Sequence, residues 1–214
     1  HPAMNQGDTL FDASGNPSCT IGYVEGDTLF TSSECGRAGD TLYSAFGEEL
    51  GTLEVPAADT SVRNKFGYLR VDSPYVSAGS NSVTGNRIAE WDAAQPGDEV
   101  CTVGASGAKR CGTYLGQDGS AVVLSQEAAG ERADLGGPVW IPGKGFLAVN
   151  SGLVAGSPTG ARIDMITRDS LPANFAEVAA ALKRGETYYQ KAPANYFSPA
   201  RPYGERVPFP VKPV

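Results

Sequence analysis

The sequence predicts an all-β protein built from two successive units of short antiparallel strands. Its 214 residues include 27 glycines and 15 prolines, a composition typical of strands joined by tight turns. Apolar segments of strand length alternate with turn residues in both halves of the chain. A hydrophobic content of 41% is sufficient for a substantial core.

The first half contains five or six predicted strands. After an irregular lead-in over residues 1–17, strands are expected at Cys19–Val24, Thr28–Thr31, Thr41–Phe46, Leu50–Val55 and Phe66–Val71. The turn signal at Gly26 and Asp27 makes the first two of these a hairpin. A polar, glycine-rich passage over residues 77–86 is predicted to be the linker to the second half.

The second half repeats the alternation of strands and turns and then changes character. Its strands are expected at residues 97–104, 109–115, 121–125, 139–141, 146–154 and 161–166. Residues 172–184 read as a helix, because apolar side chains recur on one face and Gly185 follows as a stop signal. Residues 186–214 hold six prolines and six aromatic residues, which favours an extended, polyproline-like tail.

Charge and composition exclude several classes of partner. The formal net charge is −7, the pI is about 4.8 and there is no basic run, so we expect no nucleic-acid partner. No apolar run approaches the roughly 18 residues that span a bilayer, so no membrane insertion is expected. With a single histidine and no Cys-x-x-Cys spacing, the sequence predicts neither a metal site nor a cofactor.

The four cysteines fall as one pair in each half of the chain. An even number at these positions favours disulfides, which would indicate an oxidising, extracytoplasmic compartment. The alternative is four buried free thiols.

Several stretches together resemble the chymotrypsin-like serine proteases, and in particular their secreted bacterial branch, which contains the α-lytic and Streptomyces enzymes. The segment Ala133-Asp134-Leu135-Gly136-Gly137-Pro138 is similar to the nucleophile motif Gly-Asp-Ser-Gly-Gly-Pro of that family. Four further stretches match family motifs in the expected order, namely Thr31–Gly36, Asn64–Arg70, Val100–Thr113 and Val149–Leu153. The resemblance covers about residues 19 to 185.

The resemblance implies a chymotrypsin-like domain over residues 1–185. It consists of two packed antiparallel β-barrels, at about residues 18–76 and 86–168, followed by the helix at 172–184. Residues 186–214 stay outside this domain. The family's cysteine bridges correspond to disulfides Cys19–Cys35 and Cys101–Cys111.

The catalytic positions of the family are altered in this chain. Glu34 stands at the place of the catalytic histidine, Lys65 at that of the aspartate and Leu135 at that of the serine. Ala133 replaces a glycine whose amide contributes to the oxyanion hole. Because serine-type acyl transfer needs a nucleophile and a base, we expect no catalytic residue at these positions and a protein that is not an enzyme.

The altered positions carry two further expectations about charge. Glu34 and Lys65 have opposite charges and are predicted to pair, the alternative being two independent surface groups. Asp134 retains the family's aspartate, which is buried against a cation, and Arg132, Arg110 or Lys109 is the candidate partner.

The resulting functional hypothesis is an inactive serine protease homologue that is secreted by, or displayed on the surface of, a bacterium. It is expected to bind a protein or peptide, such as another cell-envelope component, through the former substrate strand, the proline-rich tail, or both. The strand is represented by Ser151, Gly152 and Leu153. Two alternatives are a serine hydrolase with a relocated nucleophile (Ser32, Ser33 or Ser151) and a structural component of the envelope.

Overall fold

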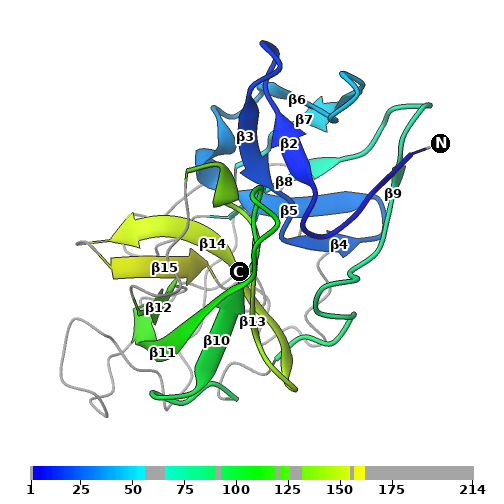
Figure 1. Ribbon diagram of the computed structural model, residues 1–214. Coiled ribbons are helices and arrows are strands. Elements are labelled where there is room, and N and C mark those ends of the chain that lie inside the picture. Colours follow the sequence, from blue (N-terminus) through cyan, green and yellow to red (C-terminus); the bar gives the residue numbers. More distant parts are fainter. Residues whose placement is uncertain are drawn as a thin grey trace, which may run out of the picture.

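The computed structural model describes residues 2–55, 66–89, 93–118, 121–125, 132–154 and 157–161. The strands gather in two halves that follow each other along the chain (Figure 1). Among the described residues, no helix has the length and apolar character needed to cross a membrane.

The first half contains two antiparallel sheets that share a core. The larger sheet has the strand order β3-β2-β6-β7 and the smaller has the order β4-β5-β8. An antiparallel bridge between Glu54 and Tyr68 joins the chain after β7 to β8. The strand bounds are β2 Thr9–Phe11, β3 Pro17–Thr20, β4 Tyr23–Glu25, β5 Thr28–Ser32, β6 Thr41–Tyr43, β7 Glu49–Thr52 and β8 Phe66–Arg70.

The second half is a closed six-stranded barrel with the order β10-β11-β12-β15-β14-β13. Its core is formed by inward-facing aliphatic side chains such as Val100, Val139 and Leu147, which are fully buried. The strand bounds are β10 Glu99–Thr102, β11 Arg110–Asp118, β12 Ala121–Leu124, β13 Pro138–Ile141, β14 Gly145–Val154 and β15 Ser157–Ala161.

The two halves pack directly against each other. The rings of Tyr23, from the first half, and Phe146, from the barrel, stack with their centroids 4.8 Å apart. A side chain at Gly22 would place its Cβ 2.3 Å from the carbonyl oxygen of Gly136, so only glycine allows the two backbones to approach this closely. The all-β architecture with two packed units is therefore as predicted.

The residues before Cys19 differ from the sequence prediction. They were expected to be an irregular lead-in but contain β1, Ala3–Met4, and β2, with Leu10 completely buried. Strands of two or three residues are too short to show an alternating pattern, and β2 forms because it pairs with β3 and β6. This part of the prediction was wrong.

The predicted linker is also more structured than expected. Its first residues form β9, Ser77–Ala78, which pairs in parallel with β1. The buried Asn81 side chain accepts a hydrogen bond from the Val24 amide at 2.7 Å and donates one to the Val24 carbonyl at 2.8 Å. An amide side chain thereby takes the place of a neighbouring strand for one residue of β4.

The N-terminal segment holds this connection in place through Gln6, which is 3% exposed. Its Nε2 donates to the Gly22 carbonyl at 2.9 Å and to Thr84 Oγ1 at 3.0 Å. Its Oε1 accepts from the backbone amides of Val83 and Thr84 at 3.1 and 2.9 Å. One side chain thus joins the start of the chain, the connection and the first half.

Both predicted disulfides are confirmed. Cys19 is bonded to Cys35 and Cys101 to Cys111, and the second pair lies on directly opposed positions of β10 and β11. The predicted helix at 172–184 and the tail at 186–214 lie outside the described residues, and the barrel boundaries at 18–76 and 86–168 stay predictions.

Candidate functional site

Three of the predicted site positions meet between the two halves, around Gly152 of β14. A Cβ placed on Gly152 would lie 3.2 Å from Cδ2 of Leu135 and 3.8 Å from Oε2 of Glu34. Gly152 has φ +86°, a left-handed conformation that side chains disfavour. β14 therefore has no side chain at the point where an apolar and an acidic side chain converge.

Leu135 is presented by a loop that is fixed on both sides. Its carbonyl accepts a 2.7 Å hydrogen bond from the Thr20 amide in the first half. On the barrel side, the Gly136 amide donates to the Asn150 carbonyl at 2.7 Å, and the Asn150 amide donates to the Gly137 carbonyl at 2.8 Å. The loop is consequently a bridge between the two halves rather than a free turn.

The two consecutive glycines of this loop are required by close approach. Gly136 has φ +87°, and a Cβ there would lie 2.0 Å from Thr31 Oγ1. A Cβ on Gly137 would lie 2.3 Å from the carbonyl oxygen of Val103. The loop can therefore pack between the two halves only with glycine at both positions.

The side chain of Leu135 is 7% exposed and belongs to the hydrophobic cluster of the first half. Ala133, two residues before it, is half-buried, and the Ala133 carbonyl accepts a 2.9 Å hydrogen bond from Thr20 Oγ1.

Glu34 lies in a short 3-10 turn, η1 Ser33–Cys35, directly after β5. The hydroxyl of Ser32 accepts a 3.0 Å hydrogen bond from the Glu34 amide and begins the turn. The following residue, Cys35, is bonded to Cys19 of β3, so the disulfide fixes the turn to the neighbouring strand. Glu34 is exposed.

The substrate-strand positions lie where β14 extends past its neighbour. The ladder between β13 and β14 ends at the pair Pro138–Val149, whereas β14 continues to Val154 alongside β15. Ser151 is buried at 1% exposure and Gly152 is half-buried. The side chain of Leu153 lies outside the described part of the structure.

Sequence reasoning missed Asn150, which shapes this end of the strand. Its Oδ1 accepts a 3.1 Å hydrogen bond from the Gly152 amide, while its backbone is bonded to both glycines of the Leu135 loop. Asn150 is the first residue of an Asn-x-Gly sequence. An asparagine at this position often accepts a hydrogen bond from the backbone two residues further on, and this was the available signal.

The predictions for Lys65 and Asp134 differ in what the structure says about them. Lys65 lies outside the described residues, so its pairing with Glu34 stays a prediction. Asp134, in the turn η3 Arg132–Asp134, is 5% exposed, and a Cβ placed on Gly104 would lie 2.2 Å from its Oδ1. Its burial agrees with the resemblance, and its pairing with a cation (Arg132, Arg110 or Lys109) stays a prediction.

A group of metal-ligand types occurs elsewhere in the described residues. The ligand atoms of Glu99, Cys101 and Cys111 lie within 4.8 Å of one another. Both sulfurs are joined in a disulfide, which removes the thiolates that would bind a metal ion. This group is therefore not a metal site.

Comparison with known proteins is informative at the level of structure. No protein-family model matches the sequence, and no curated protein matches it by sequence. The Nocardiopsis protease aligns with a TM-score of 0.60 at 18% identity, over 78% of this chain and 96% of that one. The chain has the chymotrypsin-like fold. Thermobifida fusca protease A gives a TM-score of 0.56 at 21% identity, and Cellulomonas bogoriensis chymotrypsin 0.57 at 19%, both over the same shares of the chains.

These neighbours correct one expectation from the sequence. The three solved structures named above, which share this chymotrypsin-like fold, are bacterial serine proteases. The expectation that the chain is not an enzyme is therefore wrong. Because the side chain of Leu135 is a hydrocarbon, a hydrolytic reaction beside it takes its nucleophile from another residue.

Proposed function

We propose that this chymotrypsin-like chain binds an extended stretch of polypeptide in the cleft between its two halves, alongside β14. The observation that carries the proposal is the convergence of Leu135 and Glu34 at Gly152, where the strand has no side chain. Glycine in a strand allows another backbone to approach closely.

The end of β14 suits the addition of a strand. The ladder with β13 ends at the pair Pro138–Val149, whereas β14 continues to Val154. Main-chain hydrogen bonds to a sheet supply affinity that depends little on sequence, and pockets for alternate side chains supply selectivity.

The two flanking side chains offer a bound peptide two different kinds of contact. Leu135 offers an apolar contact on the inner side, and Glu34 offers a carboxylate at the rim. The disulfides Cys19–Cys35 and Cys101–Cys111 suit an oxidising compartment, so the partner would be a polypeptide met outside the cytoplasm.

A selection of displayed random peptides against the full chain tests this function. We expect binders whose affinity falls about tenfold or more in Gly152→Ala, because the new Cβ occupies the place of approach. Gly26→Ala is the matched control, since Gly26 also has a positive φ (+58°) but has nothing within 4 Å and lies in the β4–β5 turn. Binders that respond equally to the two substitutions, or a selection that yields none, would contradict the proposal.

Peptide hydrolysis is a second candidate function, favoured by the serine proteases that share the fold. Ser32 and Ser151 are buried at 0% and 1% exposure, whereas Ser33 is half-buried in the turn that carries Glu34. Ser33 is therefore the hydroxyl best placed to meet a substrate. A fluorophosphonate probe should label the chain at Ser33, and Ser33→Ala should abolish the label. Labelling that survives this substitution, or none at all, counts against a nucleophile at Ser33.

A further inference from the structure

A second hollow lies in the barrel half, away from Leu135 and Glu34. It is a cavity of about 280 Å³ between the connection to the barrel and the turn from β13 to β14. Its walls include Val83 and Arg87 on one side and Trp140 and Pro142 on the other. Trp140 and Arg87 are the kinds of side chain that proline-rich and aromatic segments contact.

The walls of this cavity are held rigidly. On the side of the connection, Phe146 donates a 2.9 Å backbone hydrogen bond to the Arg87 carbonyl. A Cβ at Gly145 would lie 2.3 Å from the same oxygen, so the two segments are in close contact. The connection at Arg87 and the start of β14 are therefore in direct contact beside the cavity.

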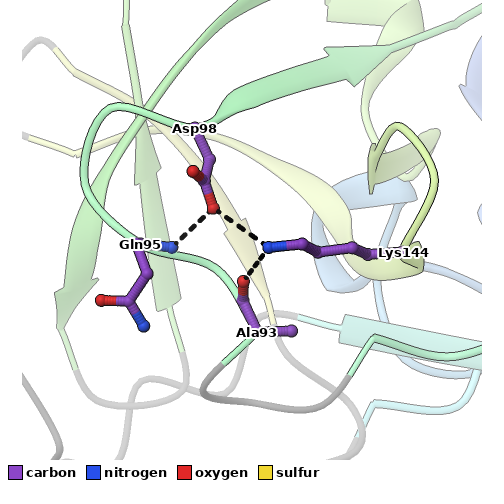
Figure 2. A network of polar contacts seen from close by, with 4 residues as sticks. All are labelled: Ala93, Gln95, Asp98 and Lys144. Carbon is purple, nitrogen blue, oxygen red and sulfur yellow. Dashed lines mark hydrogen bonds and ion pairs between the residues drawn. The ribbon is translucent and has the colours of Figure 1, made fainter.

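The opposite wall is fixed by the contacts drawn in Figure 2. Lys144 Nζ donates to the Ala93 carbonyl at 2.8 Å and lies 3.5 Å from Asp98 Oδ2. The same carboxylate oxygen accepts from the Gln95 amide at 2.9 Å. The turn after β13 is thereby joined to the loop before β10.

The chain itself contains a segment that suits this cavity. Residues 186–214 hold six prolines and six aromatic residues, and Phe209 alone among these aromatics has a proline on both sides. This cavity is smaller than common ligand pockets, so it accommodates one ring with its flanking prolines rather than a large ligand. The segment carries four basic and two acidic residues.

β15 ends on the side of the barrel where β14 begins. β15 is antiparallel to β14, with Ala161 opposite Val149, so β15 runs along β14 in the direction of Gly145. Four residues of strand separate Val149 from Gly145, a distance of roughly 13 Å. The 46 residues from Ala161 to Val207 are far more than this distance requires.

We propose that residues 207–211, Val-Pro-Phe-Pro-Val, of the same chain dock in the cavity formed by Val83, Arg87, Trp140 and Pro142. Phe209 would enter against Trp140 and Arg87, and the flanking prolines would keep the segment extended.

Cross-linking of lysines in the full chain tests this docking. Docking places Lys212 near Lys144, so a Lys144–Lys212 cross-link should dominate over Lys109–Lys212. Val83→Glu puts a charge into the cavity and should abolish that cross-link. Phe46→Glu is the matched control, because Phe46 is 80% exposed and Val83 36%, so neither substitution disturbs the core. Mixing isotopically labelled and unlabelled chains separates links within a chain from links between chains.

The outcomes are decisive in both directions. Intramolecular Lys144–Lys212 links that Val83→Glu and Phe209→Ser remove, and Phe46→Glu keeps, support the docking. Links between chains, links indifferent to Val83→Glu, or the absence of Lys144–Lys212 links would overturn it.

Discussion

Gly152 is the residue on which the candidate site depends, because it leaves the backbone of β14 uncovered between Leu135 and Glu34. The two side chains come from different halves of the molecule. Their meeting was predictable from the sequence only through the resemblance, since residues a hundred positions apart share no local pattern. That these positions hold a leucine and a glutamate, by contrast, is given by the sequence itself.

At the same scale, Glu34 and Lys65 should be weakly coupled. Glu34 is exposed, and exposed ion pairs contribute roughly 0.2–1 kcal/mol, less than a buried pair would. A double-mutant cycle in urea with Glu34→Gln, Lys65→Met and both together measures the coupling. A coupling of zero would show two independent surface groups, and several kcal/mol would require burial of the pair.

Two buried tyrosines predict a decline in stability at alkaline pH. Burial, reinforced by Glu25, raises the pKa of Tyr23 to about 12, and burial, reinforced by Glu54, raises that of Tyr68 to about 12. Between about pH 10 and 12 the unfolded chain loses these protons while the folded chain keeps them, so the free energy of unfolding falls as pH rises. The loss is up to about 2–3 kcal/mol for each tyrosine.

Denaturant unfolding across this range checks the alkaline prediction. Tyr23→Phe and Tyr68→Phe should each flatten the decline, whereas Tyr75→Phe, at a residue 66% exposed, should leave it as in the parent. Curves for Tyr23→Phe and Tyr68→Phe that run parallel to the parent would contradict this account.

Among the elements, the hairpin β4–β5 and the long strands of the barrel were predictable, because turn residues and apolar runs mark them in the sequence. β1 and β9 were not. They pair across more than 70 residues, and each has only two residues, so their structure comes from tertiary contacts alone. Residues 162–214 lie outside the described part of the chain.

The N-terminal segment should contribute strongly to stability through Gln6. Gln6→Leu would leave the Gly22 carbonyl and the amides of Val83 and Thr84 without their buried partner, at a cost of about 2–4 kcal/mol. Asn5→Ala, which removes an exposed acceptor of the Ser80 amide, should cost about 1 kcal/mol or less. Equal effects of the two substitutions in denaturant unfolding would show that the segment is peripheral.

For the molecule as a whole, the candidate site lies where the two halves make contact, and the Leu135 loop joins them. This loop is bonded to Thr20 on one side and to Asn150 on the other. The relative position of the halves and the form of the site are therefore linked, and a bound polypeptide would stabilise both together.

The most direct test of polypeptide binding is amide hydrogen exchange of the full chain with and without a selected peptide. We predict that the peptide slows exchange in residues 150–154 and in the segment that carries Glu34, and that Gly152→Ala removes this protection while Gly26→Ala preserves it. Protection that falls elsewhere on the molecule, or that persists in Gly152→Ala, would contradict a polypeptide-binding cleft at β14.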